Sequence, residues 1–168
     1  MKFTQEIIDQ VADLLGRQPR GLEDIPVTRP DGAPMVIRVG SLVDDKPFPT
    51  MFWLIDPELC YRIDRSEAAG TIKRLQAVID ADSALQDAMR EDNRRYMALR
   101  ESLMSDETRQ ALQQLGFGDV LEQKGIGGIA DFTRIRCLHT WYAAHLVESN
   151  TVGKLLDRWW LEESTGSS

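Results

Sequence analysis

The chain has 168 residues, a net charge of −7 and two cysteines. A chain of this length is most simply one domain, and it can bury enough apolar surface to fold without a disulfide or a metal. The acidic balance argues against a nucleic-acid partner, because proteins that bind nucleic acids gather lysine and arginine on one face. No apolar run approaches the roughly 20 residues that a membrane-spanning helix needs. The N-terminus is too polar for a signal peptide, so we expect a cytoplasmic protein with reduced thiols and no membrane partner.

The first third of the chain carries the whole of the predicted sheet. The turn dipeptide Asp31-Gly32 lies between two short apolar runs, a pattern typical of a β-hairpin. A compact apolar run that follows Pro49 is typical of a third strand. In chain order, the predicted segments are a helix over 3–16, irregular chain over 17–34, hairpin strands over 25–28 and 35–39, a loop over 44–49 and a strand over 51–55.

The remaining two-thirds of the chain have helical periodicity. Asp56 and Pro57 suit the cap and the first position of a helix, and Gly70 suits a break. The segment 134–148 is apolar on most sides, which predicts a central buried helix with Asp131 or Thr133 as its cap. The predicted segments are a helical stretch over 57–79 with Gly70 as its break, helices over 83–104 and 106–115, a glycine-rich loop over 124–130, and helices over 134–148 and 151–162.

These elements predict an α+β fold in which a small antiparallel sheet of residues 25–55 packs on a mainly helical body. We expect one domain over residues 1–162, with the last helix lying against the helix at 134–148. The polar residues 163–168 form a disordered tail in this prediction.

A window of nine residues holds Cys137, His139 and His145, which are the natural candidates for catalysis or metal binding. On one regular helix, Cys137 and His139 lie about 200° apart, and Cys137 and His145 lie about 12 Å apart along the axis. These groups can therefore share a site only if Cys137 precedes the helix or other segments supply partners. Packing in the core is the alternative for Cys137, and we expect His145 to be a hydrogen-bonded core residue.

Positive charge gathers at the predicted start of the 134–148 helix. Arg134 and Arg136 lie close to Cys137, and such neighbours lower the pKa of a thiol. The glycines just upstream, together with a helix start, are typical of an anion site, although a plain flexible loop is the alternative. The ligand-binding candidates are Arg134, Arg136, Gly127, Gly128, Trp53 and Arg65.

Several short motifs occur together in one order, and as a set they resemble a bacterial family known as domain of unknown function 501. They are Pro47-Phe-Pro-Thr50, Trp53-Leu54, Asp56-Pro57, Arg65-Ser-Glu-Ala-Ala-Gly70, Arg136-Cys-Leu-His139 and Asn150-Thr-Val-Gly153. The resemblance covers roughly residues 18–157. It supplies a pattern of shared residues but no function, because no established activity comes with the family name.

The chain departs from this family pattern at two informative places. Members often carry a cysteine before the proline that matches Pro57, where this chain has Asp56, and another near the segment that matches Arg29-Pro30. If those cysteines bind zinc with Cys137 and His139, Asp56 can supply a carboxylate oxygen instead. The resemblance thus implies Asp56, Cys137 and His139 as metal candidates and zinc as the candidate cofactor, with a poorer set of ligands than the family's cysteines would supply.

Three functions remain open at this point. The first is a binding or regulatory domain that takes a small anionic ligand, or an acidic group of a partner protein, at the start of the 134–148 helix. The second is an enzyme, with Cys137 as a nucleophile activated by His139 or with a hydrolytic metal site of Asp56, Cys137 and His139. The third is a protein-interaction module that uses the polar helices over 83–108.

Overall fold

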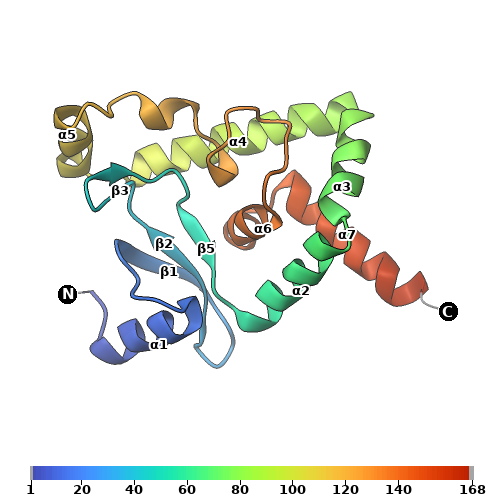
Figure 1. The fold of residues 1–168 in the computed structure, drawn as a ribbon, viewed down its shortest axis with the longest axis horizontal. Coiled ribbons are helices and arrows are strands. Elements are labelled where there is room, and N and C mark those ends of the chain that lie inside the picture. Colours follow the sequence, from blue (N-terminus) through green and yellow to red (C-terminus); the bar gives the residue numbers. More distant parts are fainter. Residues whose placement is uncertain (1, 167–168) are drawn as a thin grey trace.

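The computed structural model describes residues 2–166 and has the predicted α+β architecture. A small antiparallel sheet lies beside a larger helical body (Figure 1). The elements, in chain order, are α1 (Gln5–Leu15), β1 (Leu22–Thr28), β2 (Pro34–Val39), β3 (Leu42–Val43), β4 (Lys46–Pro47), β5 (Phe52–Leu54), α2 (Pro57–Ala68), α3 (Thr71–Asp80), α4 (Ser83–Leu103), α5 (Asp106–Gln114), the 3₁₀ turns η1 (Val120–Gln123) and η2 (Ile126–Gly128), α6 (Leu138–Val147) and α7 (Thr151–Gly166).

The sheet has the order β1-β2-β5 with antiparallel pairing throughout. The predicted hairpin is confirmed: the N–H of Arg29 donates to the carbonyl of Ala33 across the turn, and Gly32 has a φ of 90°. β1 begins at Leu22, inside the segment expected to be irregular, and it includes Pro26. A proline is tolerated there because β1 is an edge strand, where the ladder does not need every N–H.

The predicted loop over 44–49 contains part of a second, very short hairpin. β3 pairs with β4 through Val43 and Lys46, which leaves Asp44 and Asp45 as the turn. Their φ angles are 51° and 61°, as a two-residue turn with left-handed geometry requires. Aspartate can adopt this conformation, but the sequence lacks the glycine or asparagine that usually marks such a turn.

Side chains alternate across the sheet and divide the core in two. Val36 and Phe52 face the helical body, whereas Ile37 and Trp53 belong to a smaller cluster that packs against α1. This alternation follows from the period of two along a strand. The sheet therefore separates the helical body from α1.

The helix boundaries after residue 56 largely follow local signals, as predicted. The carboxylate of Asp56 accepts a hydrogen bond from the N–H of Leu59 at 3.0 Å, and Pro57 is the first residue of α2. Gly70, with a φ of 84°, separates α2 from α3. The predicted polar helix over 83–104 and the following short helix are confirmed as α4 and α5.

Two buried polar residues of α4 hold the loops that cross it. The guanidinium of Arg100, only 4% exposed, donates to the carbonyls of Pro49, Leu121 and Lys124. The Asn93 amide accepts from the N–H of Ile126 and donates to the carbonyl of Phe132. The inward face of this polar helix thus satisfies backbone groups that would otherwise be buried without partners.

The central helix is α6, which lies in the middle of the helical body with β5 on one side and α2 and α7 on the other (Figure 1). It begins at Leu138, so the expected start at 134 and the expected caps, Asp131 and Thr133, are wrong. The side chain of Gln76 on α3 donates to the carbonyl of Thr133 and accepts from the N–H of Ile135. These two bonds keep the preceding chain out of the helix.

The last helix, α7, lies against α6 as predicted but runs to Gly166, four residues past the expected end. The hydroxyls of Ser164 and Thr165 donate to carbonyls one turn back, which satisfies these polar side chains within the helix. The last two residues of the predicted tail lie outside the described residues. No helix within residues 2–166 is both long and apolar enough to cross a membrane.

Candidate metal centre

Cys137 occupies the N-cap of α6, immediately before the first helical residue. Its φ of −150° and ψ of 124° are those of extended chain, so the 200° separation expected on a regular helix does not apply. Its sulfur lies 3.8 Å from Nδ1 of His139. The sequence requirement that Cys137 precede the helix is therefore met, and the two residues share a site.

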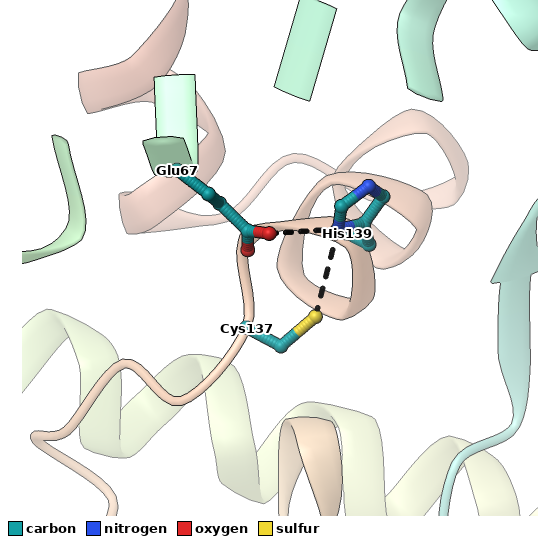
Figure 2. A group of neighbouring side chains, drawn as sticks. All are labelled: Glu67, Cys137 and His139. Atoms are coloured by element: carbon teal, nitrogen blue, oxygen red, sulfur yellow. Dashed lines mark hydrogen bonds and ion pairs between the residues drawn. The ribbon is translucent and has the colours of Figure 1, made fainter. Parts of the chain in front are cut away.

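Glu67 of α2 completes a group of three donor atoms (Figure 2). Its Oε1 lies 3.3 Å from Nδ1 of His139, and its Oε2 accepts a hydrogen bond of 2.9 Å from the N–H of Leu138. The ligand atoms of Glu67, Cys137 and His139 all lie within 4.8 Å of one another. We call these three residues the Glu67 cluster.

Asp64 contacts the histidine of the cluster from the other side. Its Oδ1 lies 2.9 Å from Nε2 of His139. Asp64 and Glu67 are three residues apart on α2, so both carboxylates point from one face of that helix toward the same imidazole. Both ring nitrogens therefore have acidic neighbours.

Sequence reasoning missed both carboxylates as site residues. Glu67 lies inside the Arg65–Gly70 motif, in which only Arg65 was predicted as a ligand-binding residue. The signal that could have found them is the pair of acids at helical spacing on a helix that reaches α6. The contact itself joins residues about 70 positions apart, which periodicity along the chain does not report.

The cluster shifts the acidity of the thiol and the imidazole in opposite directions. Burial raises the pKa of Cys137, but hydrogen bonds from the His139 ring and from the N–H of Thr140 outweigh it, and the net shift is downward. The hydrogen bond to Cys137 raises the pKa of His139 to about 9, burial opposes it, and the charges of Glu67, Cys137 and Asp64 add to the rise. The pair therefore favours a thiolate beside an imidazolium.

The donor set and spacing fit a zinc ion. Zinc binds cysteine sulfur at about 2.3 Å and histidine nitrogen at about 2.0–2.1 Å, so neighbouring donors of a tetrahedral site lie roughly 3.3–3.6 Å apart. The nitrogen of His139 lies 3.3 Å from the oxygen of Glu67 and 3.8 Å from the sulfur of Cys137. Small side-chain movements would bring all three onto one ion, once His139 gives up the proton on Nδ1.

The structure does not bring Asp56 into this cluster. Its side chain is 1% exposed, and its two oxygens accept from the N–H of Leu59 and from the guanidinium of Arg29, at 3.0 and 2.5 Å. Arg29 and Asp56 mark the two places at which the family resemblance implies cysteines. In this chain these two residues are in contact and form an ion pair. Asp56 caps α2 and pairs with Arg29. The carboxylate beside Cys137 and His139 comes from Glu67 instead.

The other arginine and aromatic candidates are dispersed. Arg134 pairs with Asp80 of α3 at 3.5 Å, and Arg136 is exposed. Arg65 lies over the ring of Tyr61 on α2, and Trp53 packs in the cluster on the α1 side of the sheet. These side chains do not meet Cys137 and His139 in one anion site.

The glycine-rich loop packs tightly against its neighbours. Gly127 and Gly128 have φ angles of 75° and 74°. A Cβ on Gly127 would lie 3.0 Å from the hydroxyl of Thr140, and one on Gly128 would lie 3.3 Å from the ring of Pro49. Their conformation and close approach account for glycine at both positions.

His145 is a hydrogen-bonded core residue, as predicted. Its Nδ1 accepts from the N–H of Asn150 at 3.0 Å, and its Nε2 lies 2.8 Å from the carboxylate of Asp157. A Cβ on Gly153 would lie 2.0 Å from the His145 ring, so only glycine fits there. This packing explains the Asn150–Gly153 motif as structural.

One comparison with known proteins identifies the chain. The model of the family described as "Protein of unknown function (DUF501)" matches residues 25–158. Neither the curated proteins nor the solved structures contain a match. Because the family match covers most of the chain and includes the Glu67 cluster, the protein belongs to the DUF501 family.

Proposed function

We propose that this protein binds one zinc ion through Sγ of Cys137, Nδ1 of His139 and Oε1 of Glu67. The observation that carries the proposal is the convergence of these three donors, from α2 and from the cap and first turn of α6, within 4.8 Å of one another. A thiolate and a carboxylate together neutralise the two charges of Zn²⁺, and imidazole is a preferred third ligand. The acids beside Cys137 and His139 favour a cation at this place over the anion expected from Arg134 and Arg136.

The surroundings of the donors support the same proposal. A histidine that binds a metal usually donates its other N–H to a carboxylate, which fixes the ring and raises its basicity. Asp64 lies in that position on Nε2 of His139, at 2.9 Å. The N–H of Leu138 holds Oε2 of Glu67 at 2.9 Å and leaves Oε1 directed at the imidazole.

Three protein ligands leave one position of a tetrahedral zinc ion for water. The side chains of Glu67 and His139 are each 27% exposed, so solvent reaches the cluster. Zinc lowers the pKa of bound water and polarises carbonyl or phosphoryl oxygens, which is the chemistry of metal-assisted hydrolysis. Metal-assisted hydrolysis is therefore the enzymatic activity that this site suits best.

Competition between the metal-free protein and a chromophoric chelator tests zinc binding. We expect one Zn²⁺ per chain, weakened more than about 100-fold by Cys137→Ser, His139→Ala or Glu67→Gln and about tenfold by Asp64→Asn. Cys60→Ser is the matched control, because Cys60 is the other thiol and donates to the carbonyl of Leu54 outside the cluster. Binding that is absent, or equal in the ligand variants and wild type, contradicts the proposal.

A second candidate is a cysteine nucleophile, favoured by the order thiol, imidazole, carboxylate. Sγ of Cys137 lies 3.8 Å from Nδ1 of His139, and Nε2 of His139 lies 2.9 Å from Asp64. This is the arrangement in which a base activates a thiol and a carboxylate orients the base. Glu67 works against it, because a second negative charge beside the sulfur disfavours the thiolate. An unreactive Cys137 in metal-free protein contradicts this candidate.

A further inference from the structure

A groove of about 740 Å³ lies on the α1 side of the sheet, away from the Glu67 cluster. Its walls are the chain that follows α1 and the β3–β4 hairpin, and its floor includes Ile37 and Val39 of β2. A volume of several hundred cubic ångströms is typical of sites for small organic molecules.

The frame of the groove is held by specific contacts. The guanidinium of Arg20 donates to the carboxylate of Asp44 at 2.7 Å, which ties one wall to the hairpin turn. The N–H of Gly40 donates to the carbonyl of Gly21 at 2.9 Å, and a Cβ on Gly21 would lie 2.7 Å from a methyl group of Val43. The two walls are therefore joined at one end.

Two stacked aromatic rings line the groove. The centroids of Phe48 and Trp53 are 5.6 Å apart with an interplanar angle of 15°. The indole N–H of Trp53 donates to the carbonyl of Thr50, which fixes the plane of the ring. The guanidinium of Arg17 lies over that ring at 5.7 Å from its centroid. A flat apolar body can stack against such a surface.

The groove is positive although the protein is acidic. The charged side chains that line it are the cations Arg17, Arg20 and Lys46 and the carboxylate Asp44. This leaves a surplus of two positive charges. Arg20 forms an ion pair with Asp44, whereas Arg17 and Lys46 form no ion pair with any residue in 2–166. Both unpaired cations are exposed and able to turn toward a bound anion.

We infer that this groove binds a small aromatic phosphate monoester, with its ring against Phe48 and Trp53 and its phosphate held by Arg17 and Lys46. A phosphate monoester carries about −1.5 to −2 charge at pH 7, which matches the surplus of the groove. The wall that carries Arg17 and Arg20 precedes the residues matched by the family model, 25–158. The site therefore combines residues inside the matched segment, among them Lys46, Phe48 and Trp53, with residues that precede it, and it does not depend on the zinc proposal.

Titration of the isotope-labelled full chain with phenyl phosphate, followed by amide NMR, tests the inference. We expect saturable shifts at residues 15–20, 42–48 and 53, with weaker binding at high salt. Inorganic phosphate and phenol each offer half of the proposed ligand, and both should bind at least about fivefold more weakly than phenyl phosphate.

A charge-matched pair of double variants separates the groove from general electrostatic attraction. Arg17→Gln with Lys46→Gln should raise the dissociation constant of phenyl phosphate at least about fivefold. Lys73→Gln with Arg158→Gln removes the same charge from exposed positions on α3 and α7 and should change it less than about twofold. Shifts outside the groove, equal losses in the two variants, or inorganic phosphate binding as tightly as phenyl phosphate would each overturn the inference.

Discussion

At the scale of single residues, the position of Cys137 at a helix N-cap decides what the site can do. Extended backbone at Cys137 turns its sulfur toward His139, which the first turn of a helix would have prevented. The other thiol, Cys60, lies within α2 and donates to the carbonyl of Leu54 at 3.4 Å. The two cysteines are both half-buried, so the chemical difference between them comes from their neighbours.

The two thiols should differ in reactivity when the metal-free protein is treated with iodoacetamide near pH 7.5. The pKa of Cys137 is lowered, which raises its share of thiolate, whereas burial and the charges of Asp64 and Asp56 raise the pKa of Cys60 to about 11. Because the thiolate is the nucleophile, Cys137 should be alkylated at least about tenfold faster. Peptide mass mapping over time measures both rates.

The variant His139→Gln serves as the control for this reactivity. It removes the ring whose hydrogen bond lowers the pKa of Cys137, so alkylation of that residue should slow while that of Cys60 stays the same. Saturating zinc should protect Cys137 and leave Cys60 unaffected. Equal rates at the two thiols in metal-free wild-type protein would contradict the electrostatic account of the site.

At the scale of the elements, the start of α6 depends on a side chain from α3. Gln76 binds the carbonyl of Thr133 and the N–H of Ile135, both at 2.9 Å, just before the cap. The chain from Thr133 to Cys137 is thereby kept non-helical, and α6 starts where Cys137 can serve as its cap. The position of the thiol is thus set partly by a residue about 60 positions earlier.

The variant Gln76→Ala should lower the free energy of unfolding by about 1–3 kcal/mol, because it leaves a backbone N–H and a carbonyl without their partner. It should also weaken zinc binding, since the segment that leads to Cys137 loses its anchor. Gln110→Ala on the exposed face of α5 is the control and should change stability by less than about 0.5 kcal/mol. Urea unfolding measures both, and equal effects of the two variants would contradict the anchoring role.

Elements defined by neighbouring residues could be predicted from the sequence, and those defined by distant ones could not. The turn at Asp31-Gly32 and the start of α2 at Asp56-Pro57 carry their own local signals, and both are confirmed. The start of α6 was predicted four residues early because periodicity does not include the bonds from Gln76. Glu67 was missed for the same reason, since its contact with His139 exists only after α2 packs on α6.

At the scale of the whole molecule, the sheet divides the protein into two faces with different chemistry. The Glu67 cluster lies in the helical body, where α2 meets α6, and the groove lined by Arg17, Lys46, Phe48 and Trp53 lies on the α1 side. The imidazole of the Glu67 cluster is flanked by the carboxylates of Asp64 and Glu67, whereas the groove has a surplus of cationic side chains. A metal in the cluster would join residues 67 and 137–139, and so link two helices that are distant in sequence.

Zinc should therefore stabilise the entire fold against unfolding. Zinc at 100 times its dissociation constant should add about 2.7 kcal/mol to the free energy of unfolding, provided that it binds only the folded chain. Thermal melts of metal-free protein with and without Zn²⁺ measure this increase. Cys60→Ser should keep the stabilisation and Cys137→Ser should lose it; the same stabilisation in both variants would place the metal elsewhere.

Anomalous diffraction at the zinc edge, from crystals of the zinc-loaded protein, shows whether a metal binds between Glu67, Cys137 and His139. The predicted result is one anomalous peak bonded to Sγ of Cys137, Nδ1 of His139 and Oε1 of Glu67, with Nε2 of His139 on Asp64. A map without a peak at this cluster, or with zinc bound only to other residues, would contradict the account.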